Sequence, residues 1–127
     1  MSGKSRPVFL NLLQIKFPVT AIISILHRVS GVVTIILLPF WLVFLKKLMV
    51  SPESYASLLA SISQSFLLKL FLWLGVVSIW YHALAGLRHL VMDFGIAEEF
   101  HVAKITSWLL LLVTVVLSVF FIFKIWC

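Results

Sequence analysis

The sequence predicts an all-α membrane protein in which three transmembrane helices form a single domain over residues 1–127. Hydrophobic residues make up 63% of the chain and charged residues only 11%, a share too small to cover the surface of a water-soluble fold. Three apolar stretches, at about 20–46, 66–92 and 105–123, are long enough to be bilayer-spanning helices, which need roughly 20 residues. The length leaves no room for a separate soluble catalytic domain.

The first span follows a segment, residues 1–19, that prolines interrupt and that we expect to lie irregularly on the membrane surface. From Arg28 to Lys46 the helix would rise about 27 Å at 1.5 Å per residue. That rise nearly matches a hydrocarbon core of roughly 30 Å. Pro39 lies inside the span, and a transmembrane helix tolerates such a proline with a local kink.

Residues 47–65 are predicted to be a polar connection that carries a short helix on the membrane surface. In Ser51-Pro52-Glu53 a capping hydroxyl precedes a proline at the first helical position, an order typical of helix starts. A short amphipathic helix is therefore expected over 55–62.

The second and third spans are predicted over 66–92 and 105–123. The rise from Lys69 to Arg88 is about 28 Å, again close to the thickness of the hydrocarbon core. The third span contains no charged residue and has a lysine on each side. The polar positions of the second span therefore stand out as candidates for function.

Basic residues give the chain a net charge of +6, but they are scattered near the ends of apolar stretches. That distribution fits a membrane interface better than a nucleic-acid-binding patch. Three spans place the chain ends on opposite sides of the membrane, and the excess of basic residues on the N-terminal side favours a cytoplasmic N-terminus and a periplasmic C-terminus. The single cysteine, Cys127, offers neither a disulfide nor a metal motif.

The stretch Ser24–Gly31 places a hydroxyl, an imidazole and a guanidinium at the mouth of the first span, on Ser24, His27 and Arg28. Polar groups there are costly in lipid and need partners. Ser24 and Arg28 are one helical turn apart, so together they could hydrogen-bond a neutral carbonyl, such as that of a quinone. The alternative is a snorkelling arginine with a serine that bonds to its own helix, which is the commoner arrangement.

A second polar group of residues ends the second span. His82 and His89 share one helical face about 10 Å apart along the axis, and His82 lies about 9 Å below the level of Arg88. A histidine at that depth needs a bond to another helix or to a metal. Small neighbours would let a helix or a flat macrocycle approach: Ala83, Ala85 and Gly86. An axial haem ligand and a simple interhelical hydrogen bond explain this pattern equally well.

Cations near the same membrane surface could pair with the propionates of such a haem. Arg28, His27, His89 and Arg88 are all candidates. His89 and Asp93 are four residues apart, so they could instead pair with each other on the helix surface.

Three stretches that contain these residues resemble a known family. They are Arg6-Pro7-Val8 with Leu10-Asn11-Leu12 and Phe17-Pro18; Ser24-Ile25-Leu26-His27-Arg28-Val29-Ser30-Gly31; and Tyr81-His82, Gly86, Arg88-His89 and Asp93-Phe94-Gly95. In order, spacing and three-span layout, nearly the whole chain is similar to the cytochrome b subunit of the membrane anchor of succinate dehydrogenase, respiratory complex II.

The resemblance implies that His82 is an axial ligand of a b-type haem (haem b), whose second ligand comes from a companion anchor subunit. It implies that His27, Arg28 and His89 lie near the haem propionates. It also implies that Ser24 and Arg28, with Ile25 between them, form part of the quinone site.

The partners implied by the resemblance are a second hydrophobic anchor subunit, an iron–sulfur subunit and a flavoprotein subunit. The three spans would then be part of a heteromeric helical bundle in a bacterial inner membrane. The implied function is electron transfer from succinate oxidation, a tricarboxylic acid cycle reaction, to ubiquinone or another quinone. The chain alone would not be catalytic, and no nucleic acid is expected as a partner.

Two other functions remain open at this point. The anchor of a quinol:fumarate reductase would use the same parts in the reverse direction, since direction depends on the potential of the quinone. A non-redox membrane subunit for assembly or transport would use His82 only for helix packing.

Overall fold

The computed structural model describes residues 16–127, which form four helices and no strand: α1 (Val19–Val50), α2 (Pro52–Gln64), α3 (Phe66–Asp93) and α4 (Phe100–Trp126). Of these, α1, α3 and α4 are long and apolar enough to cross a membrane. This confirms the prediction of an all-α protein with three spans. The expected surface segment, 1–19, lies outside the described residues except for its last four positions.

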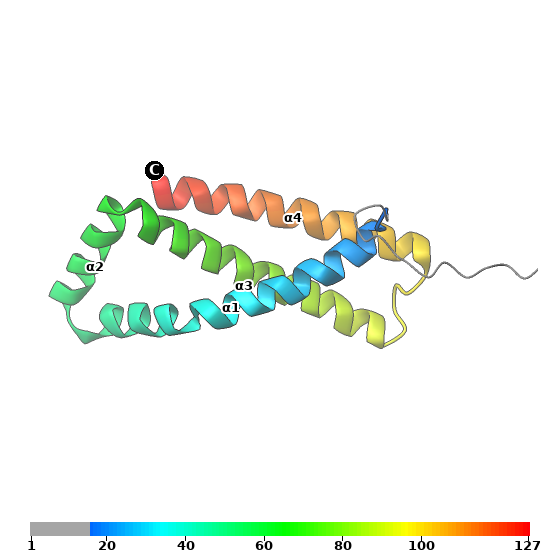
Figure 1. Cartoon of the computed structure of the whole chain (residues 1–127), viewed down its shortest axis with the longest axis horizontal. Helices are drawn as coiled ribbons and strands as arrows, with labels where there is room; N and C mark the ends of the chain where they lie inside the picture. The colour runs from blue at the N-terminus through cyan, green and yellow to red at the C-terminus, as the bar shows by residue number, and fades with distance from the viewer. Residues whose placement is uncertain (1–15) are drawn as a thin grey trace, which may run out of the picture.

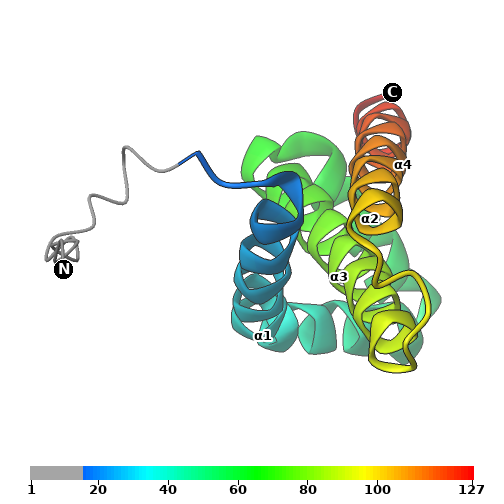
Figure 2. The same ribbon diagram turned by 90° about the vertical axis from the view of Figure 1, so that its right-hand side faces the viewer.

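The helix α3 lies between the other two spans (Figure 2). In Figure 1, α1 runs from right to left and crosses α3, which runs in the opposite direction, while α4 lies along α3. The short helix α2 joins α1 to α3 at the end of the bundle remote from the start of α1. Consequently the start of α1, the end of α3 and the start of α4 all lie at the same end.

The start of α2 follows from local chemistry. Ser51 caps α2, because its Oγ accepts a hydrogen bond from the Ser54 backbone N–H at 3.1 Å, and Pro52 occupies the first helical position. The helix then continues past the predicted 55–62 to Gln64. In α1, Pro39 lies inside the helix without ending it, as expected for a proline in a membrane span.

A small core joins the three spans. It consists of Ile23 from α1, Tyr81 and Ala85 from α3, and Leu110 from α4. The buried Tyr81 hydroxyl donates a hydrogen bond to the Ile23 carbonyl at 3.1 Å, so α1 and α3 are joined by a polar bond as well as by packing. Most other apolar side chains on the spans are exposed, which suits surfaces that face lipid or another membrane subunit.

Three glycines let rings from one helix lie against the backbone of the other. A Cβ on Gly31 of α1 would lie 2.9 Å from the His82 ring, and a Cβ on Gly75 of α3 would lie 2.5 Å from Trp41 Nε1. A Cβ on Gly86 would lie 3.4 Å from His27 Nε2. The small residues thus allow α1 and α3 to approach closely, as is common in membrane helix pairs.

The Tyr81 bond provides a test of this packing. Interhelical hydrogen bonds in membrane proteins are worth about 0.6 kcal/mol on average and roughly 1.7 kcal/mol at most. Tyr81→Phe should therefore lower the unfolding midpoint of the purified protein in detergent, measured by thermal denaturation, by a small but resolvable amount. Tyr55→Phe, at an exposed position on α2, is the matched control and should leave the midpoint unchanged. Equal midpoints for the two variants would contradict a stabilising role for the Tyr81 bond.

Candidate functional site

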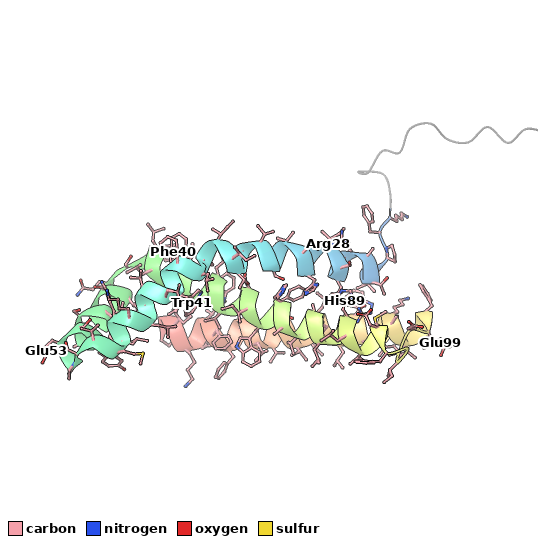
Figure 3. All side chains as sticks on the ribbon, turned by 90° about the horizontal axis from the view of Figure 1, so that it is seen from below. Arg28, Phe40, Trp41, Glu53, His89 and Glu99 are labelled. Atoms are coloured by element: carbon pink, nitrogen blue, oxygen red, sulfur yellow. The ribbon has the colours of Figure 1, made fainter. Side chains whose placement is uncertain are left out.

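Three imidazoles meet between α1 and α3. The rings of His27 and His82 are stacked, with centroids 4.3 Å apart and planes inclined by 22°. The ring of His89 lies 5.1 Å from that of His27, and Figure 3 shows His89 in the space between the two helices. The spacing of His82 and His89 places both on the face of α3 that meets α1.

The hydrogen bonds of His82 define which ring nitrogen carries the proton. His82 Nδ1 lies 3.1 Å from the His27 backbone carbonyl and 3.3 Å from Ser30 Oγ. The Ser30 hydroxyl donates its only proton to the same carbonyl at 2.7 Å, so both oxygens can only accept from Nδ1. In the neutral ring the proton therefore resides on Nδ1, which leaves the lone pair of Nε2 free. Metal-ligating histidines have this arrangement, with the non-ligating N–H donated to a carbonyl.

The backbone of α1 supplies the space for this ring. Gly31 faces the His82 ring directly, and an added Cβ would lie 2.9 Å from Cε1 and 3.2 Å from Nδ1. Contacts that short require the ring to move. Gly31 thus has a steric role in placing the candidate ligand.

His27 carries a polar atom without a partner. Its Nε2 is buried and makes no hydrogen bond to any residue of the described range 16–127. It faces Gly86 of α3. A buried polar group without a hydrogen bond is destabilising, so this nitrogen is suited to a partner from outside the described chain, such as the carboxylate of a bound cofactor.

Ser24, Ile25 and Arg28 lie on a different face of α1. Ile25 is 47% exposed, Ser24 is half-buried and Arg28 is exposed. The Arg28 side chain points away from α3 (Figure 3). Within the described part of the chain, Ser24 and Arg28 have no hydrogen-bond partner, so the expected alternative of a serine bonded to its own helix is not observed. Among residues 16–127 their donors are therefore unused and are available to a ligand or another subunit at this surface.

Comparison with known proteins identifies the family. Residues 2–121 match the model of the family described as succinate dehydrogenase/fumarate reductase transmembrane subunit. The chain belongs to this family.

Similar proteins cover most of the chain. The succinate dehydrogenase cytochrome b556 subunit of Coxiella burnetii is 34% identical over 86% of this chain and 87% of its own length. That of Paracoccus denitrificans is 36% identical over 91% and 88%. The cytochrome b560 subunit of Reclinomonas americana is 35% identical over 84% and 77%. The family and the three apolar helices together indicate a multi-pass membrane protein.

Arg88 does not belong to the histidine cluster of this family member. Its Nε donates to Thr106 Oγ1 at 3.1 Å and its Nη2 to the Ala103 carbonyl at 2.9 Å. Both acceptors are on α4, so Arg88 joins α3 to α4. Its position near the same membrane surface made Arg88 a candidate partner for the propionates, but depth in the membrane does not define the direction around the helix axis. The possible pairing of His89 with Asp93 is also not observed, since the ring of His89 lies beside that of His27.

Sequence reasoning missed Ser30 and Gly31 as neighbours of His82. Both lie in the stretch that carries the family resemblance, but neither has a charge or a metal-binding group to mark it. The helical spacing of Ile23, His27 and Ser30 could have indicated one common face toward α3.

Proposed function

We propose that this chain is a membrane-anchor subunit of succinate:quinone oxidoreductase that binds a b-type haem through His82 and helps to form the quinone-reduction site. The observation that carries the proposal is the hydrogen bond of His82 Nδ1 to the His27 carbonyl, which leaves Nε2 available to iron. The family membership and the cytochrome names of the similar proteins support the same function.

The described residues fit a haem with one ligand from this chain. His82 would share the iron with a ligand from the companion anchor subunit, as the family resemblance implies. His27 and His89 would bind the propionates, and His27 Nε2, which is buried and without a partner among residues 16–127, is available for this role. Such a haem would supply electron transfer.

Ser24 and Arg28 would hold a carbonyl oxygen of ubiquinone or another quinone, with Ile25 against its apolar part. A hydroxyl and a guanidinium donate hydrogen bonds that strengthen as the oxygen gains negative charge, which favours reduction. Arg28 is directed away from α3, so the quinone would bind on the outer side of α1. This chain alone covers only one side of that site, and other subunits would complete it.

The exposed apolar faces of the spans are suited to a second hydrophobic anchor subunit and to lipid. The iron–sulfur and flavoprotein subunits would dock at the end where α1 starts, because the excess of basic residues on that side favours its location in the cytoplasm. This arrangement corresponds to a bacterial inner membrane with the C-terminus in the periplasm. The chain would contribute binding and electron transfer to the enzyme without catalysing succinate oxidation itself.

A quinol:fumarate reductase anchor is the second candidate, because the family description names both enzymes. The similar proteins described above are named as subunits of succinate dehydrogenase, and this favours the direction from succinate to quinone. A non-redox packing role for His82 is disfavoured, because such a role does not explain why His27 Nε2 is buried without a partner among residues 16–127.

Replacement of His82 tests the haem assignment. The purified complex should show a b-type band in its reduced-minus-oxidised optical spectrum, and His82→Ala should remove or strongly perturb that band because one iron ligand is lost. His101→Ala, at an exposed position near the start of α4, is the control and should keep the band. An unchanged spectrum in His82→Ala would exclude this residue as the ligand.

The quinone site is tested by separating the two half-reactions. Loss of a hydrogen bond to a charged group costs about 1.5–3 kcal/mol, roughly a 10- to 100-fold change in rate. Arg28→Leu should lower quinone reduction by about this factor, and Ser24→Ala should lower it less, while succinate oxidation with an artificial acceptor persists. Lys124→Leu, near the opposite end of α4, should affect neither rate. Normal quinone reduction in both site variants would refute the assignment, and loss of both half-reactions would indicate failed assembly.

A further inference from the structure

We infer that Ser30 is a positioning residue for His82, and that as a second acceptor for the Nδ1–H of His82 it tunes the reduction potential of the iron that His82 would bind. This inference rests on the proposed role of His82 as a haem ligand. The observation behind it is a triangle of three polar atoms, the Ser30 hydroxyl, the His27 carbonyl and His82 Nδ1, separated by 2.7, 3.1 and 3.3 Å.

Ser30 differs from the other serines that bond to their own helix. Such bonds are common in membrane helices and are usually only structural, as in Ser107, whose hydroxyl donates to the Ala103 carbonyl at 2.8 Å. Ser107 shares its acceptor carbonyl with Arg88, whereas Ser30 shares its acceptor with the candidate iron ligand His82, and its Oγ itself lies 3.3 Å from His82 Nδ1. It is only 7% exposed, so little solvent is available to replace it at the imidazole.

The hydroxyl of Ser30 acts on His82 in two ways. Because its proton is directed to the His27 carbonyl, its lone pairs face His82 Nδ1 and give that N–H a second acceptor. The ring also lies close to the backbone at Gly31 and is stacked on the ring of His27. The acceptors at its edge therefore determine its rotation and keep the proton on Nδ1.

The loss of the Ser30 hydroxyl should change the reduction potential of the haem in a defined direction. Acceptors on the outer N–H of a ligating imidazole raise its basicity, and a more basic ligand stabilises the oxidised iron. Removal of the Ser30 hydroxyl takes away one of two acceptors. His82 then becomes a weaker electron donor, and the reduction potential of the haem rises.

The test is a redox titration of the haem band in the purified complex. Ser30→Ala should retain haem and shift its midpoint potential upward. Ser30→Thr, which keeps a hydroxyl able to bond the same carbonyl, should restore a potential close to that of the unmodified protein. Ser107→Ala removes a comparable buried hydroxyl on α4 and should leave the potential unchanged.

Each outcome of the titration supports or overturns the role of Ser30. An unchanged potential in Ser30→Ala, or an equal shift in Ser107→Ala, would overturn the inference. If Ser30→Ala loses haem while Ser30→Thr and Ser107→Ala retain it, the positioning role stands in a stronger form. Absence of haem from the unmodified complex would instead refute the proposed function itself.

Gly31 offers an independent check of how α1 positions the His82 ring. Gly31→Ala would place a methyl group 2.9 Å from the His82 ring, so it should displace the ring and weaken haem retention during purification. Gly75→Ala creates a similar clash with Trp41 and costs comparable packing, but it should leave the haem spectrum intact. Equal loss of haem in the two variants would show that packing in general, and not the position of His82, controls haem binding.

Discussion

The hydrogen bond between the His82 ring and the backbone of α1 is the interaction on which the arrangement of this protein depends. An imidazole within a membrane-spanning helix is unstable without a partner, and a backbone carbonyl can accept its proton only if the two helices approach closely. Gly31 permits that approach, and Ser30 completes the set of acceptors. The placement of α1 against α3 and the position of the proton on the His82 ring therefore have a common cause.

The two faces of α1 serve different purposes. The face with His27 and Ser30 is turned toward α3, where it surrounds the His82 ring. The face with Ser24 and Arg28 is turned away from α3. Because these residues are close together in the sequence, a ligand on the outer face would lie near the histidines without sharing their space. This separation is compatible with two adjacent redox sites, each completed by other subunits.

Much of the fold follows from the sequence, because bilayer thickness limits where apolar helices can begin and end. The cap at Ser51 also has a local chemical signature, and the helical period places His82 and His89 on one face. The direction of Arg88 could not be predicted, because depth in the membrane gives no information about rotation around the helix axis. The role of Gly31 was hidden for a related reason, since its partner ring comes from a helix remote in the sequence.

The paired contacts of Gly31 with His82 and of Gly75 with Trp41 have a consequence for the length of the chain. Each helix offers one glycine and one ring, so sliding or rotation of α1 relative to α3 would disrupt both contacts at once. Removal of a single residue between Gly31 and Trp41 would turn one relative to the other by about 100° around the helix axis. The number of residues between Gly31 and Trp41 thus sets their relative orientation around the axis of α1. Changes in chain length should therefore be tolerated better in the connecting segments than within this part of α1.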